Sequence, residues 1–187
     1  GFLFTELHDV INEWNGYYRF DRSKKMFGLD ELVQDMTMND FHSDLYVVAG
    51  DDFYQNYTGG STVSIPVGIS AVTNDIPENL TLKYSIYGWD ELGEKKDHSS
   101  GEIEVSVEPF AFKQLSSVEF VVPNQDILMI FATLLEDNNG KVIQRNFVPF
   151  KVSGLSKSKN TIITQSPSDF TGADWSIKQN ATQKGKK

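Results

Sequence analysis

The chain has 187 residues, a net charge of -9, an isoelectric point near 4.8 and no cysteine. We expect no nucleic-acid and no membrane partner, because an acidic chain lacks the basic surface that nucleic acids and anionic membranes attract. The lack of cysteine excludes disulfides and thiolate metal sites. Aromatic residues make up 12% of the chain, which favours strands over helices.

Residues 1–40 begin with a predicted buried strand and end with a predicted short helix. The run GFLFTEL at 1–7 is almost wholly apolar, and a polar, aromatic-rich loop follows it. Further on, four apolar residues recur at helical spacing, and the acidic Asp30 and Glu31 suit the first turn of a helix. These apolar residues are Leu29, Leu32, Val33 and Met36.

From residue 44 to residue 153 the chain consists of short apolar or alternating runs, which predict strands. The run at 61–70 alternates with one apolar face and has Pro66 on the other, which predicts an edge strand or a bulge. The run at 126–137 is more continuously apolar, as a central strand would be. The predicted strands lie at 44–50, 61–70, 80–89, 102–110, 116–123, 126–137 and 141–153.

The segments between these runs predict turns and loops. Asn139-Gly140 separates two apolar runs and predicts a hairpin, because such a pair adopts positive φ readily. The polar stretch at 91–102 predicts a longer loop. Evenly spaced strands without intervening helices predict a mainly β fold, an immunoglobulin-like or fibronectin III-like antiparallel β-sandwich, in preference to a closed barrel.

The composition therefore divides the chain into three parts. Residues 1–40 form a strand, loop and helix, residues 41–153 form the sandwich, and residues 154–187 are rich in Ser, Thr, Lys and Asn. The last part has too little apolar surface to fold alone, and we expect it to be largely disordered.

The first 25 residues resemble a motif of family 2 glycoside hydrolases, the β-galactosidase and β-glucuronidase-like enzymes. In that family a similar run forms the last strand of a (β/α)₈ barrel and the loop after it, an immunoglobulin-like domain follows, and some members continue into a jelly-roll domain whose start resembles residues 166–179. The matching positions are Gly1, Phe2, Thr5, Leu7, Asp9, Glu13, Asn15, Gly16, Lys24 and Lys25.

The resemblance implies that this chain is a non-catalytic, C-terminal portion of such an enzyme. The barrel needs eight strands, and the family takes its two catalytic carboxylates from the fourth and seventh, which this chain lacks. The sandwich would then be a structural spacer between the barrel and a C-terminal domain. The resemblance favours a secreted or periplasmic location for the parent enzyme, and it implies no cofactor.

A first group of candidate residues follows the predicted N-terminal strand. At the C-terminal end of a barrel strand, Glu6, Asp9, Glu13 and Trp14 would line the sugar-binding cleft of an intact enzyme. The alternative is that they only cap the barrel and seal it to the sandwich. His8 beside Asp9 and Glu13 lacks the spacing of a metal site, so we expect no metal there.

A second group is aromatic, and it supports the alternative that the sandwich is a carbohydrate-binding module of a polysaccharide-degrading enzyme. Its members are Phe53, Tyr54, Tyr57, Tyr87 and Trp89, which either contact a glycan or simply pack. The acidic Asp44, Asp51 and Asp52 suggest a calcium site, although such residues are usually only solvated. A further alternative is an unrelated adhesion-type sandwich with a private N-terminal extension.

The predicted partners are the remainder of the parent glycosidase and, in the alternative, glycans. If the strand at 1–7 is not part of a barrel, its apolar side chains Phe2, Leu3 and Phe4 have no neighbours to pack against. Burying such side chains is worth about 1.5–3 kcal/mol each. We therefore expect this strand to join a sandwich edge or to form a homodimer.

Overall fold

The computed structural model describes residues 5–52 and 54–155, which lie in one compact unit. The predicted N-terminal strand falls mostly on residues 1–4, and the predicted edge pairing or homodimer through it lies outside the described residues. The same holds for Phe53 and for the predicted disorder after residue 155. The part of the predicted strand that is described, residues 5–7, is not a strand.

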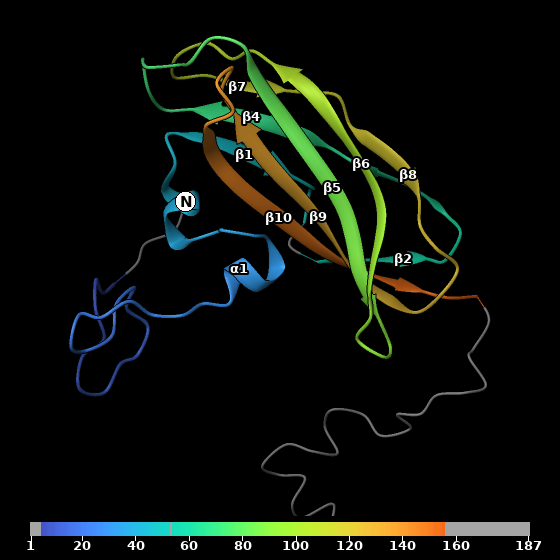
Figure 1. Cartoon of the computed structure of the whole chain (residues 1–187), viewed down its shortest axis with the longest axis horizontal. Coiled ribbons are helices and arrows are strands. Elements are labelled where there is room, and N and C mark those ends of the chain that lie inside the picture. Colours follow the sequence, from blue (N-terminus) through green and yellow to red (C-terminus); the bar gives the residue numbers. More distant parts are fainter. Residues whose placement is uncertain (1–4, 53, 156–187) are drawn as a thin grey trace, which may run out of the picture. The chain divides into compact units, whose positions relative to one another are not determined.

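A five-stranded sheet forms one layer of the fold, with the order β2-β10-β9-β5-β6 (Figure 1). Its neighbouring strands are antiparallel, except that β2 runs parallel to β10. The predicted central strand is β9, which lies between β10 and β5 as expected. The bounds are β2 Gln55–Thr58, β5 Leu80–Asp90, β6 Lys95–Val105, β9 Ile127–Glu136 and β10 Val142–Ser153.

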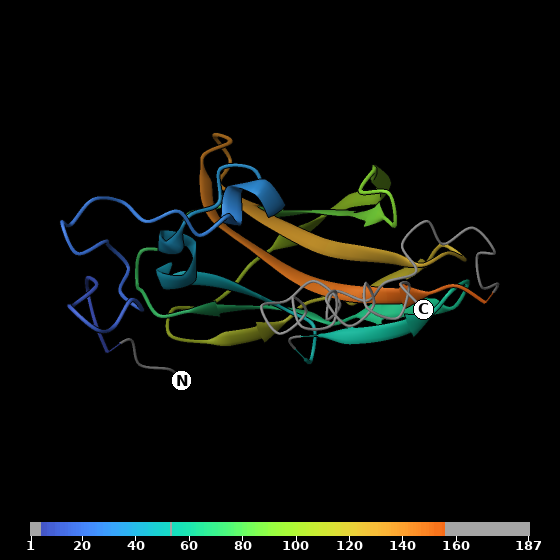
Figure 2. The ribbon, with the colours of Figure 1, turned by 90° about the horizontal axis from the view of Figure 1, so that it is seen from below.

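The second layer consists of two small sheets, β1-β4-β7 and β3-β8 (Figure 2). Pro66 ends β3 and precedes β4, so one alternating run changes its strand partner at the proline, which has no N–H to donate. The fold is a mainly β sandwich whose strand pairs are antiparallel except for β2 and β10, which confirms the predicted class of fold. The bounds are β1 Leu45–Ala49, β3 Thr62–Ile65, β4 Val67–Ala71, β7 Phe112–Gln114 and β8 Val118–Val121.

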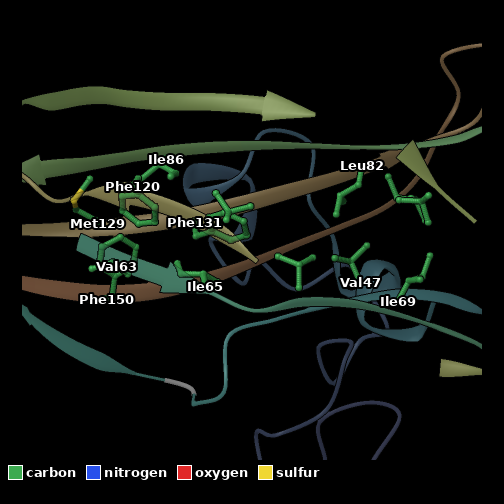
Figure 3. Close-up of a cluster of buried hydrophobic side chains, with 14 of the residues drawn as sticks. Val47, Val63, Ile65, Ile69, Leu82, Ile86, Phe120, Met129, Phe131 and Phe150 are labelled. Atoms are coloured by element: carbon green, nitrogen blue, oxygen red, sulfur yellow. The ribbon is translucent and has the colours of Figure 1, made fainter. Parts of the chain in front are cut away.

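The main core lies between the layers, and the alternating patterns point into it. Figure 3 shows Phe131 of β9 and Phe150 of β10 among branched aliphatic side chains of both layers. The four residues predicted to share a face at 61–70 are all buried. They are Val63, Ile65, Val67 and Ile69.

The β9–β10 hairpin confirms the predicted turn. Gly140 has φ +74, and the Asp137 carboxylate accepts hydrogen bonds from the backbone N–H groups of Asn139 and Lys141. The predicted loop at 91–102 is wrong, because residues from Lys95 onward form β6. The polar sequence misled the prediction because most of this strand at the sheet edge is exposed.

Two short helices precede the sandwich. Helix α1, Leu29–Leu32, confirms the predicted helix but is shorter than its apolar spacing suggested. The 3₁₀ helix η1, Met38–His42, was not predicted, although Thr37 and Asp40 form a capping box at its start. Within the described residues, neither helix has the length and apolarity that a membrane crossing requires.

Candidate functional site: the N-terminal segment and its seam with the sandwich

Residues 29–42 pack against the outer face of the five-stranded sheet. Val33 and Met36 are buried in a second apolar cluster with Tyr87, Ile130 and Ala132. Ile130 belongs to this face because side chains alternate along a strand and its neighbour Phe131 lies in the main core. This segment therefore shares a core with the sandwich.

The hydroxyl of Tyr87 strengthens this packing by donating a hydrogen bond to the carbonyl of Leu32, the last residue of α1. Burial raises the pKa of Tyr87, because the phenolate form would lose its hydration. The hydroxyl therefore stays protonated at neutral pH and keeps donating to the helix.

Asp40 fastens η1 to strand β10. Its carboxylate is buried and accepts from the backbone N–H of Thr37 at 2.8 Å and of Arg145 at 2.8 Å. The Arg145 guanidinium adds an ion pair of 3.8 Å to the same carboxylate. Removal of Asp40 would leave these part-buried donors without their acceptor, so this contact holds the segment in place.

Two buried amides continue this polar seam from β10 to β1. Gln144 accepts from the Val47 N–H and donates to the Asp40 carbonyl, each at 3.3 Å. Asn146 donates to the Val47 carbonyl at 2.8 Å. Neither amide was predicted from the sequence, although their alternate positions in a predicted strand were a usable signal.

Residues 7–25 instead form a loop that is closed by its own side chains. The carboxylate of Asp9, which is buried, accepts from the backbone N–H of Gly16 at 3.0 Å and from Lys25 Nζ at 2.6 Å. Lys25 also donates to the Trp14 carbonyl at 2.6 Å and to the Gly16 carbonyl at 3.2 Å. Asp9 is therefore engaged in holding the loop rather than open to a ligand.

The other motif residues support the same loop. A side chain at Gly16 would place its Cβ 2.3 Å from the backbone carbon of His8, so only glycine fits. The Asn15 amide donates to the Thr5 hydroxyl at 3.2 Å. The spacing of the motif is thus explained by contacts within the loop.

Glu6 and Glu13, both predicted cleft residues, come together as a carboxyl pair. Desolvation, followed by repulsion from Glu13, raises the pKa of Glu6. Glu6 Oε2 is buried and has no donor among the described residues. The two carboxyl groups can therefore hydrogen-bond only while one of them carries a proton.

The loop also presents large apolar side chains to solvent. Ile11 is 82% exposed, Trp14 is 78% exposed and Phe20 is 66% exposed. They line one side of a hollow of about 580 Å³ whose remaining lining includes Asp9, Arg19 and Lys25. A contiguous exposed apolar surface of this kind is typical of an interaction site.

The structure does not gather the predicted aromatic residues into one exposed platform. The ring of Tyr57 packs edge-on against the core residue Phe150, and Tyr87 is buried under α1. Trp89 is half-buried beside Tyr87, and Tyr54, just before β2, is 50% exposed. Phe53 lies outside the described residues.

Within residues 5–52 and 54–155, no three His, Asp or Glu side chains are arranged to hold a metal ion. Asp44, Asp51 and Asp52 therefore do not form the calcium site considered from the sequence. His8, Asp9 and Glu13 do not form a metal site either.

No protein-family model matches the chain, and comparison with curated proteins finds no match. The chain is similar to a cycloisomaltooligosaccharide glucanotransferase from Paenibacillus sp., with 12% identity and a TM-score of 0.41, over 57% of this chain and 14% of that one. It is also similar to a β-glucuronidase from Bacteroides uniformis, with 13% identity and a TM-score of 0.40, over 57% and 12%. A Niemann-Pick type C2 protein from the Japanese carpenter ant matches with 10% identity and a TM-score of 0.38, over 59% and 90%. Similarities at this level assign neither a family nor an activity.

Proposed function

We propose that this chain is a non-catalytic accessory portion of a larger, family 2-like glycoside hydrolase. In this proposal the sandwich is a rigid spacer, and residues 5–42 connect it to the catalytic part. The sequence motif that suggests the family lies in this connecting segment, at Asp9, Asn15, Gly16 and Lys25.

One observation carries the proposal: the connecting segment is fastened at one end and open at the other. Asp40 and Met36 are buried against the sandwich, whereas Ile11 and Trp14 are exposed. A segment built this way can fix the orientation of the sandwich relative to a catalytic domain that packs on the apolar side chains of the loop. An isolated module would gain nothing from leaving these side chains in water.

The carboxylates of the segment support a non-catalytic role. Asp9 is neutralised by Lys25. Glu6 and Glu13 are close enough for Glu13 to raise the pKa of Glu6 by repulsion and a side-chain hydrogen bond, whereas a retaining glycosidase separates its two carboxyl groups by about 5 Å so that a sugar fits between them. The pair is therefore suited to sharing a proton rather than to cleaving a glycoside.

The experiment begins with the coding sequence upstream of this chain, where we expect seven more barrel strands and two catalytic glutamates. The upstream portion is then produced alone and together with this chain, and turnover of aryl glycosides is measured. We expect the upstream portion to need this chain for full activity, and the two to co-elute in size-exclusion chromatography.

Single substitutions in the exposed loop should locate the contact between this chain and the upstream portion. Ile11→Ser and Trp14→Ser should weaken co-elution, whereas the control Leu92→Ser should not, although Leu92 is similarly exposed at 68%. An upstream sequence without a barrel, or equal effects of all three variants, would contradict the proposal.

A further inference from the structure

The outer face of the five-stranded sheet is only partly covered by residues 29–42. The covered part contains Tyr87 and Ile130. Two residues before Ile130 on β9, Leu128 lies on the same face, because side chains alternate along a strand. Leu128 is 46% exposed, so the face beyond α1 meets solvent.

A row of residues crosses this uncovered face from edge to edge. Leu128 pairs with Trp89 of β5 on one side and with Lys151 of β10 on the other. Directly paired residues share a face of the sheet. At the two ends of the row, Lys151 pairs with Asn56 of β2 and Trp89 pairs with Lys95 of β6. We call this row the outer strip; it consists of Asn56, Lys151, Leu128, Trp89 and Lys95.

The middle of the outer strip is apolar and rigid. The Trp89 ring packs edge-on against Tyr87, with the ring centroids 5.7 Å apart. Lys95 Nζ lies 4.1 Å above the Tyr87 ring, which holds this lysine along the face. Lys95 and Lys151 are separated by three strand spacings, or about 14 Å, with Trp89 and Leu128 between them.

The outer strip is positive although the whole chain has a net charge of -9. Its five residues include two lysines and no carboxylate. Lys151 makes no ion pair with a described residue. Of the acids in the β5–β6 turn, Asp90 and Glu94 bind Lys96 at 3.7 and 2.6 Å, whereas Glu91 is exposed in the turn itself. Asp97 pairs with Tyr87 in the adjoining row, two residues along β6 from Lys95, and partly compensates that lysine. The least compensated charge of the strip therefore belongs to Lys151.

We propose that the outer strip binds an acidic oligosaccharide. A pyranose ring stacks its C–H face on Trp89 and Leu128, and carboxylates of the sugar chain pair with Lys151 and, more weakly, with Lys95. A row of exposed side chains across a sheet suits an extended chain of rings, whereas compact small molecules are usually bound in concave pockets. This binding is independent of the spacer role, because the outer strip shares no residue with the exposed loop at 5–28.

Isothermal titration with alginate oligosaccharides tests the proposal, with cello-oligosaccharides as the neutral counterpart. We expect alginate fragments to bind and to bind more weakly as salt rises, because exposed ion pairs are screened. Cello-oligosaccharides should bind clearly more weakly, since they offer no carboxylate.

The variant Lys151→Glu should weaken alginate binding by about five-fold, the scale of an exposed charge contact. Its matched control is Lys113→Glu on β7, which belongs to the other layer and should change nothing. Trp89→Ala should abolish binding, and thermal unfolding of that variant shows whether it still folds. If it does not fold, the Lys151→Glu variant still tests the proposal, because Lys151 is exposed. No binding of alginate, equal binding of the neutral sugar, or equal effects of the two lysine variants would each overturn the proposal.

Discussion

Residues 29–42 and residues 5–28 are adjacent in sequence, but the sandwich holds only the first of them. Met36 and Asp40 are 2% and 7% exposed, and their partners lie on the strands of the five-stranded sheet. Met26 and Trp14 are both 78% exposed, and most contacts that close their loop come from the loop itself, with one further contact between Tyr17 and His42 of η1 at 2.6 Å.

The segment before the sandwich therefore has two parts: residues 29–42 share the core of the domain, and residues 5–28 leave apolar side chains exposed to a partner. The first part should unfold together with the sandwich, because its buried contacts are lost only when the sheet is lost. The second should open locally at a lower free energy, because few buried contacts tie it to the rest.

The largest expected effect comes from Asp40→Ala. It removes the acceptor of two part-buried backbone N–H groups and the partner of Arg145, so we expect the free energy of unfolding to fall by about 3 kcal/mol. Urea unfolding followed by tryptophan fluorescence measures it. Asp30→Ala, an exposed acid of α1, is the control, and an equal effect there would remove the distinction between the two regions.

The two methionines offer the next comparison. Met36→Ala should cost about 2.5 kcal/mol, because it opens a cavity between the segment and the sheet. Met26→Ala should change stability by less than about 0.5 kcal/mol, as exposed substitutions usually do. Thermal unfolding of both variants checks the prediction, which similar losses would contradict.

Lys25→Met should act on the loop alone. It leaves Asp9 without its ion pair and removes the donor to the Trp14 carbonyl, so cleavage within residues 5–28 by a protease should become faster. The unfolding midpoint of the sandwich should stay unchanged. Lys24→Met is the control for the loss of a charge, and a midpoint shift as large as that of Asp40→Ala would show that the loop is part of the sandwich after all.

The smallest effect concerns pH. The pKa of Glu6 is raised above 4.5, so the protonated form is favoured in the folded loop. The stability that this proton confers is present below pH 4.5 and is lost as pH rises through the raised pKa, where Glu6 and Glu13 repel each other. Protease cleavage of the loop should therefore accelerate with pH in the native chain, after correction for the pH dependence of the protease.

Glu6→Gln supplies a neutral donor to Glu13 at every pH. The rate of loop cleavage should therefore vary less with pH in this variant than in the native chain. Cleavage of a model peptide at each pH corrects for the pH dependence of the protease itself. Identical pH profiles of the two chains would contradict the proton-sharing pair.

The strands and the hairpin turn could be read from the sequence because their signals are local. Val63, Ile65 and Val67 alternate with polar neighbours or the proline, and Gly140 follows Asn139, so nearby residues suffice to predict a buried face and a turn. The first half of β6, residues 95–100, could not be read in this way, since an edge segment with both faces exposed carries no apolar alternation, whereas its end falls within the strand predicted at 102–110. That Glu6 interacts with Glu13 and that Asp9 pairs with Lys25 could not be read from the sequence, because both contacts depend on how the loop closes, and the sugar-cleft role of these residues stays a prediction.

Local sequence patterns suffice for the class of fold, because the two-residue period and the turn residues act over a few positions. The pairing of distant polar side chains follows only from the folded arrangement. Asp40 accepts from a backbone N–H 105 residues away, and Gln144 reaches Val47 across the seam between β10 and β1. These pairings depend on how the strands and the preceding segment pack. The residues next to either partner in the sequence do not determine that packing.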